Sequence, residues 1–201
     1  MAGGSSGGSC HLPNCPDHNM KTFPTLVFVL LFSLAAGVVE AQTIHDAARK
    51  NSIPEVTQYL TANPGAVNSK DSNGFTPLHI TSIEGYTELS EFLIDRGASV
   101  AAVDNAKMTP LHWAALMNNI HICRPLVARG APINALDYSD RAPIHYSAAA
   151  GHFDITDYLL TRGANPNIVD KDGRTAFGEA VINAKIDMIR LLRERGAKLV
   201  K

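Results

Sequence analysis

Three short stretches recur along this chain and decide its fold: TPLHI at residues 76–80, TPLHW at 109–113 and APIHY at 142–146. Their histidines lie 33 residues apart each time. A fixed period of this length indicates a stack of similar units, each of which buries its apolar face against its neighbours. The spacing therefore predicts a repeat architecture.

The same period governs an aspartate, a glycine–alanine pair and a leucine. These residues are Asp71, Asp104, Asp137 and Asp170; Gly97, Gly130, Gly163 and Gly196; and Leu93, Leu126, Leu159 and Leu192. The proline of each quoted stretch fits the first position of a helix, with a threonine before it as a cap in two of the three. The glycine fits the left-handed residue that ends a second helix, on which the leucine packs. Each repeat is therefore expected to hold two helices.

This pattern resembles the ankyrin repeat, whose 33-residue unit carries the sequence T-P-L-H-x-A. The resemblance covers residues 42–201 and implies an all-α solenoid of about five helix–turn–helix units with short β-hairpin loops. The expected repeats are 42–70, 71–103, 104–136, 137–169 and 170–201. The first is degenerate, because residues 44–48 align with 78–82 at an offset of 34, and the last lacks the histidine and proline. Both are interpreted as caps.

The first 41 residues lack the repeat. Residues 1–19 are rich in Gly and Ser and are expected to be a disordered extension, unless Met20 is the true start. Residues 23–39 form an uncharged apolar run, which predicts a signal peptide over 20–41 that is cleaved before Gln42. An uncleaved signal-anchor is the alternative, because a run of this length is near the shortest that spans a membrane. We expect a periplasmic or secreted protein, and the lack of an N-x-S/T sequon slightly favours the periplasm.

Composition and motifs argue against several functions. The 201 residues carry a formal net charge of −1, which disfavours nucleic-acid binding. No HExxH, CxxC or glycine-rich phosphate loop occurs, and GxSxG occurs only within the Gly/Ser-rich residues 3–8, so we predict no catalytic residues, no cofactor and no metal site. The resemblance implies that the repeated histidines bond to backbone, and Cys123 is expected to be a buried thiol. Cys10, Cys15 and His18 could chelate zinc loosely, but their spacing is more typical of a solvated tail.

The resemblance implies that a protein partner binds on the concave face, which is formed by the hairpin tips and the first helix of each repeat. An apolar strip is expected there, because exposed apolar surface with Trp, Tyr and Met is typical of interfaces. Its residues are Phe75, Ile80, Ile83, Met108, Trp113, Leu116, Met117, Tyr138 and Tyr146. Arg141, Arg174 and Lys171 form an expected polar rim. Alternatively, these apolar side chains fold back onto neighbouring helices.

The sequence therefore predicts an exported, monomeric, non-catalytic module that binds an unidentified protein. One alternative is a scaffold that residues 23–39 anchor in the membrane, which requires that this segment stays uncleaved. Another is a secreted effector that acts on host proteins.

Overall fold

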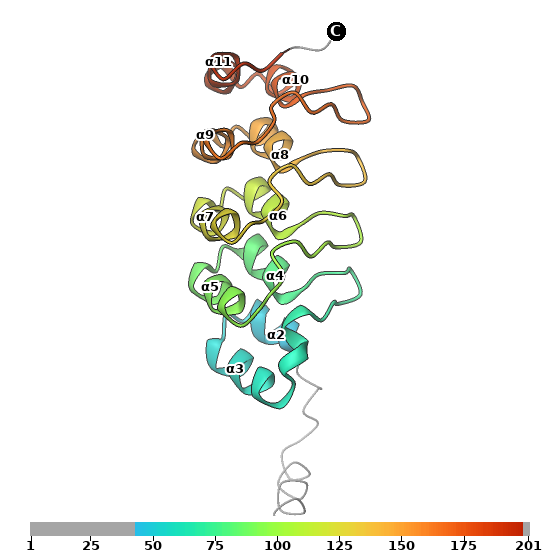
Figure 1. The fold of residues 1–201 in the computed structure, drawn as a ribbon, viewed down its shortest axis with the longest axis vertical. Coiled ribbons are helices and arrows are strands. Elements are labelled where there is room, and N and C mark those ends of the chain that lie inside the picture. Colours follow the sequence, from blue (N-terminus) through green and yellow to red (C-terminus); the bar gives the residue numbers. More distant parts are fainter. Residues whose placement is uncertain (1–42, 199–201) are drawn as a thin grey trace, which may run out of the picture. The chain divides into compact units, whose positions relative to one another are not determined.

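The computed structural model describes residues 43–198 (Figure 1). The expected extension (1–19), the signal peptide (20–41) and the apolar run at 23–39 lie outside these residues. Residues 42–201 form one compact unit. Within the described range, no helix has the length and apolar character needed to cross a membrane.

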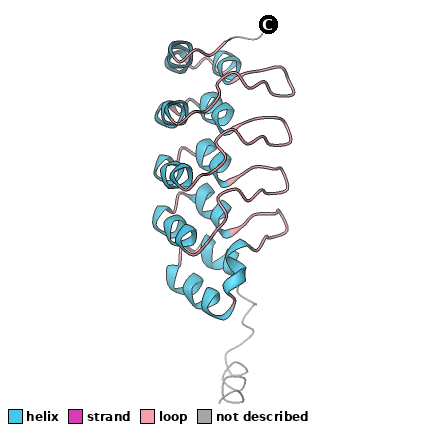
Figure 2. Cartoon of the chain, in the orientation of Figure 1, coloured by secondary structure: helices cyan, strands magenta, loops and turns pink. Residues whose placement is uncertain are grey.

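Between residues 43 and 198 the chain folds into ten α-helices and one short 3-10 helix, without a strand (Figure 2). The first helices of the five repeats are α2 (Ile44–Arg49), α4 (Pro77–Glu84), α6 (Pro110–Leu116), α8 (Pro143–Ala150) and α10 (Ala176–Ile182). The second helices are α3 (Ile53–Ala62), α5 (Thr87–Asp95), α7 (Ile120–Ala128), α9 (Phe153–Thr161) and α11 (Ile186–Glu194). The 3-10 helix η1 (Pro64–Asn68) follows α3.

The helices stack in two layers, one of first helices and one of second helices (Figure 1). Each first helix contacts its own second helix and the first helix of the next repeat. From α5 onward the second helices also contact one another in order. The loops between repeats project from the first-helix layer on the side away from the second helices (Figure 1). The all-α repeat solenoid expected from the sequence is confirmed.

Local sequence explains where the helices start and stop. Pro77, Pro110 and Pro143 are the first residues of their helices, where a proline loses no hydrogen bond. Gly97 and Gly130 follow the second helices with φ of 88° and 81°, a left-handed conformation that favours glycine. The period-33 leucines on the second helices are completely buried in one continuous apolar core.

The loops between repeats are tight hydrogen-bonded turns. In each, the amide of the repeat-opening aspartate donates to the carbonyl four residues later, as from Asp104 to Met108 at 3.0 Å. Adjacent loops are joined by one amide–carbonyl bond, such as that from Tyr138 to Ala106 at 3.0 Å. A single bond per junction is too little for a continuous ladder. The expected β-hairpins are therefore present as bonded turns, with no strand among the described residues.

Candidate functional site

Each repeat-opening aspartate organises its loop. One carboxylate oxygen, Oδ1, accepts hydrogen bonds from the backbone N–H groups two and four residues later; for Asp104 these are Ala106 at 2.7 Å and Met108 at 2.9 Å. The same pair of bonds forms at all four positions. The other oxygen, Oδ2, accepts a bond from a different group each time, namely Arg49, Trp113, Tyr146 and Arg141. These carboxylates are therefore occupied with holding the loops.

The repeated histidines hold the first helices to the loops. In His79, Nδ1 accepts the backbone N–H of Thr76 at 3.1 Å, so the proton lies on Nε2, which donates to the carbonyl of Met108 at 3.1 Å. His112 and His145 repeat this arrangement. Burial lowers the pKa of all three imidazoles. His45 bonds to the carbonyl of Phe75 at 3.0 Å, as the alignment of the degenerate first repeat requires.

Two members of the predicted apolar strip are not on the surface. Ile80 is only 3% exposed and belongs to the main core, because its position on α4 faces the neighbouring helices. Met108 is 6% exposed, because Asp104 and His79 both bond to its backbone and hold the residue inside the loop. Ile80 and Met108 therefore add almost no exposed surface to the predicted strip.

Three aromatic members of the strip fold back onto the protein. Phe75 and Trp113 pack edge to face with ring centroids 5.6 Å apart, and the indole N–H of Trp113 donates to Asp104 at 2.9 Å. The Tyr146 hydroxyl donates to Asp137, and burial together with this bond raises the pKa of Tyr146. These half-buried rings fit the alternative interpretation, in which the side chains pack between repeats.

The remaining strip residues retain more surface. Ile83 and Leu116 are half-buried, whereas Met117 is 42% and Tyr138 is 55% exposed. The Lys107 ammonium lies 4.7 Å from the centre of the Tyr138 ring, a cation–π contact that orients the ring. Of the predicted set, Met117 and Tyr138 therefore present the largest exposed fractions.

Sequence reasoning missed a second set of exposed apolar residues on the loops. Val103, Leu136 and Val169 are each the residue before a repeat-opening aspartate, and 37–44% of each is exposed. The aspartates that follow them are buried. Their recurrence at the period of 33 was the signal that could have revealed them. We call these three residues the loop row.

The side chains of the expected polar rim mostly bond to other groups of the protein itself. Arg141 donates from Nε to Asp170 at 2.9 Å and from Nη2 to Glu179 at 3.0 Å, and Arg174 lies 3.5 Å from the same Glu179 oxygen. Burial alone would raise the pKa of Asp170, but the Arg174 amide and the Arg141 guanidinium hold it below its ordinary value. This network connects the last two repeats, so Arg141 has few donors left for a partner.

The reactive groups within residues 43–198 suggest structural roles. Cys123 is fully buried, and burial raises the pKa of its thiol to about 12, which keeps it protonated. In this range, no three His, Cys, Asp or Glu side chains are grouped to hold a metal ion.

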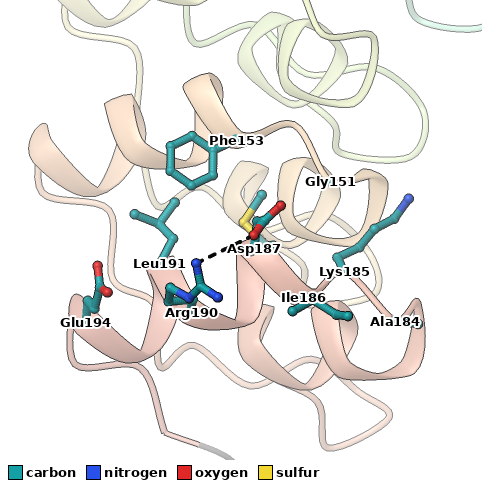
Figure 3. Close-up of a pocket in the computed structure, with 10 residues that line it drawn as sticks. Gly151, Phe153, Ala184, Lys185, Ile186, Asp187, Arg190, Leu191 and Glu194 are labelled. Atoms are coloured by element: carbon teal, nitrogen blue, oxygen red, sulfur yellow. Dashed lines mark ion pairs between the residues drawn. The ribbon is translucent and has the colours of Figure 1, made fainter.

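A shallow cleft of about 650 Å³ lies between α9 and α11, and it is lined by Phe153 and Ile186 together with charged side chains (Figure 3).

The fold and these contacts define a class of protein: a stack of helix pairs whose polar groups hold the repeats together and whose loops carry exposed apolar residues. A family model for ankyrin repeats, spanning three copies, matches residues 44–137 and 131–201. The chain belongs to the ankyrin repeat family, whose members generally act as protein–protein interaction modules and are typically non-catalytic. No curated protein matches the chain.

Proposed function

We propose that this chain is an exported, non-catalytic module that binds a protein partner through the face formed by the loops between its repeats. The observation that carries the proposal is the loop row, which exposes one aliphatic side chain in each of three consecutive repeats. Exposed apolar side chains that recur in a row on a folded surface usually mark a contact with another molecule.

The loops hold this row in place before any partner arrives. The Tyr138 amide donates to the Ala106 carbonyl and the Lys171 amide to the Ser139 carbonyl, each at 3.0 Å, so neighbouring loops are tied together. The aspartate beside each row residue fixes its own turn. A surface that is already ordered loses less conformational entropy on binding than a mobile loop does.

Tyr138 extends the row. It lies two residues after Leu136 and is 55% exposed. Tyrosine combines a large apolar ring with a hydroxyl and is enriched where interfaces concentrate binding energy. The proposed contact is therefore centred on Leu136 and Tyr138, with Val103 and Val169 on either side.

A quantitative capture experiment tests this contact. Immobilised residues 42–201 are exposed to extract from the source organism, and the retained proteins are measured by mass spectrometry. A variant with Leu136→Ser and Tyr138→Ser should lose at least about tenfold of its specific partner, because both central contacts are removed. The matched control is Phe153→Ser, which removes an exposed apolar side chain of α9 outside the loops. Equal retention by the loop variant and the wild type would contradict the proposal.

Export is tested separately by sequencing the N-terminus of the protein purified from its source. The proposal expects a mature chain that starts at Gln42. A chain that retains residues 23–39 and fractionates with membranes would instead support the anchored scaffold.

A further inference from the structure

The loop that leads into α4 (Figure 1) carries an asparagine–glycine pair within its turn. Asn73 and Gly74 form the only such pair in the 201 residues. Asn73 is exposed, and its side-chain amide makes no hydrogen bond with any described residue. Gly74 has a φ of 79°, a conformation that residues with side chains rarely adopt. An exposed amide therefore precedes a residue that has no side chain.

An asparagine in this setting can lose ammonia without an enzyme, because no side chain on the glycine hinders the approach of its nitrogen. The backbone nitrogen of the glycine gives its proton to hydroxide and attacks the asparagine side-chain carbon, Cγ. The N–Cγ bond forms, the Cγ–Nδ2 bond breaks, and ammonia leaves. Water then opens the five-membered imide ring at one of its two carbonyls, which yields aspartate or isoaspartate.

Three hydrogen bonds hold this turn closed in the folded protein. The Gly74 N–H, which would have to give up its proton, donates to the Asp71 carbonyl at 2.9 Å. The Asn73 N–H donates to Asp71 Oδ1 at 2.9 Å, and the Asn73 carbonyl accepts the Asn105 N–H at 3.1 Å. The nitrogen can therefore turn towards Cγ only after the turn has opened locally.

The side chain of Asn105, in the next loop, closes over the turn. Its amide donates to the Ser72 carbonyl at 3.0 Å. A Cβ placed on Gly74 would lie 2.6 Å from Asn105 Oδ1, so this side chain rests directly against the glycine. At the equivalent Gly173, in the loop before α10, no described atom lies within 4 Å of such a Cβ. The closed state of the first turn thus depends on the loop of the following repeat.

We propose that Asn73 is a site of spontaneous deamidation and that Asn105 sets its rate. The isoaspartate product routes the backbone through the former side chain, which adds one atom to the backbone of the turn. This added atom separates the groups that now bond to Asp71 and to the Asn105 N–H. Deamidation at Asn73 therefore loosens the contact between repeats 71–103 and 104–136.

Mass spectrometry of the purified protein tests the proposal after incubation at mildly alkaline pH. Trypsin releases residues 71–96, in which Asn73 has the only side-chain amide, so a mass change from NH2 to OH identifies the site. In the folded wild type this site should deamidate faster than Asn51, which is also exposed but precedes a serine. Asn105→Ala should raise the rate at Asn73 about fivefold, the change in the open population expected for one lost hydrogen bond. In urea the variant and the wild type should react at the same rate.

The matched control is Asn134→Ala, which removes an asparagine side chain that also bonds across a repeat junction, one junction further from Asn73. It should leave the rate at Asn73 unchanged. Circular dichroism verifies that both variants are folded. The proposal is overturned if Asn73 reacts no faster than Asn51 in the wild type, or if Asn105→Ala and Asn134→Ala give the same rate. A difference between Asn105→Ala and the wild type that persists in urea would also overturn it.

Discussion

The two carboxylate oxygens of each repeat-opening aspartate have different roles, one that is the same in every repeat and one that varies. Oδ1 always fixes the turn, whereas Oδ2 takes an arginine, an indole N–H or a phenol, depending on the repeat. The variable partners Trp113 and Tyr146 are thereby drawn into the structure. An apolar strip inferred from residue type alone therefore overestimated the surface that these aromatic residues offer.

The histidines predict a pH dependence of stability. In His112, Nδ1 accepts an N–H and Nε2 donates to a carbonyl, so a second proton would place two N–H groups against each other. Burial lowers the pKa of His79, His112 and His145 from the ordinary 6.5, so the unfolded chain binds more protons than the folded one below that pH. Stability should be complete above pH 6.5 and fall as the pH drops towards 5.

Urea unfolding between pH 7.5 and 5 measures this effect, in a range that lies above the ordinary pKa of the carboxylates, about 4. The variant His112→Gln cannot titrate there, so it should be less stable at neutral pH but lose less stability on acidification. As a control at an exposed site, His121→Gln should lose stability with falling pH as steeply as the wild type. If His112→Gln also loses stability as steeply as the wild type, the His112 ring does not contribute to the pH dependence.

At the scale of elements, side-chain amides clamp one repeat to the next, except at one junction. The Asn134 side chain accepts the backbone N–H of Asn165 at 2.9 Å and donates to the Gly163 carbonyl at 3.4 Å. Asn68 does the same two junctions earlier, and Asn167 does so one junction later. The equivalent residue between repeats 71–103 and 104–136 is Ala101, which has no such amide. The residue whose amide would donate to it is Pro132, which has no N–H.

Restoring this clamp should stabilise the protein. The double variant Ala101→Asn with Pro132→Asn can form both missing hydrogen bonds, worth about 1 kcal/mol each at most. Ala101→Asn alone should gain less, because its Oδ1 still faces a proline. Urea unfolding compares the single and double variants. A double variant no more stable than the single one would refute the explanation.

At the scale of the molecule, stability is expected to be a sum of terms between neighbours. Helix α7 contacts α5 and α9, whereas α11 contacts only α9 among the second helices. Leu126 on α7 and Leu192 on α11 are equivalent and both fully buried. Because the two leucines are equally buried, any difference between the effects of replacing them should come from their positions in the stack.

Replacing each leucine with alanine tests this difference. Leu126→Ala should cost about 3 kcal/mol and increase hydrogen exchange in repeats on both sides. Leu192→Ala should increase exchange mainly within residues 170–198, because the last repeat can open while the others remain folded. Hydrogen exchange with mass spectrometry locates the change. Exchange raised evenly along the whole chain by Leu192→Ala would contradict a nearest-neighbour stack.

The sequence by itself determined the repeat period, the helix pairs, the structural use of histidine and aspartate, and the family, because these depend on local signals that return every 33 residues. Only the tertiary structure decided which apolar side chains reach the surface. Exposure at Ile80, Trp113 or Val181 depends on atoms contributed by another repeat, such as Phe75 against Trp113. Equivalent positions therefore differ in exposure, as when Ala115 and Ala148 are fully buried and Val181 in the last described repeat is 43% exposed.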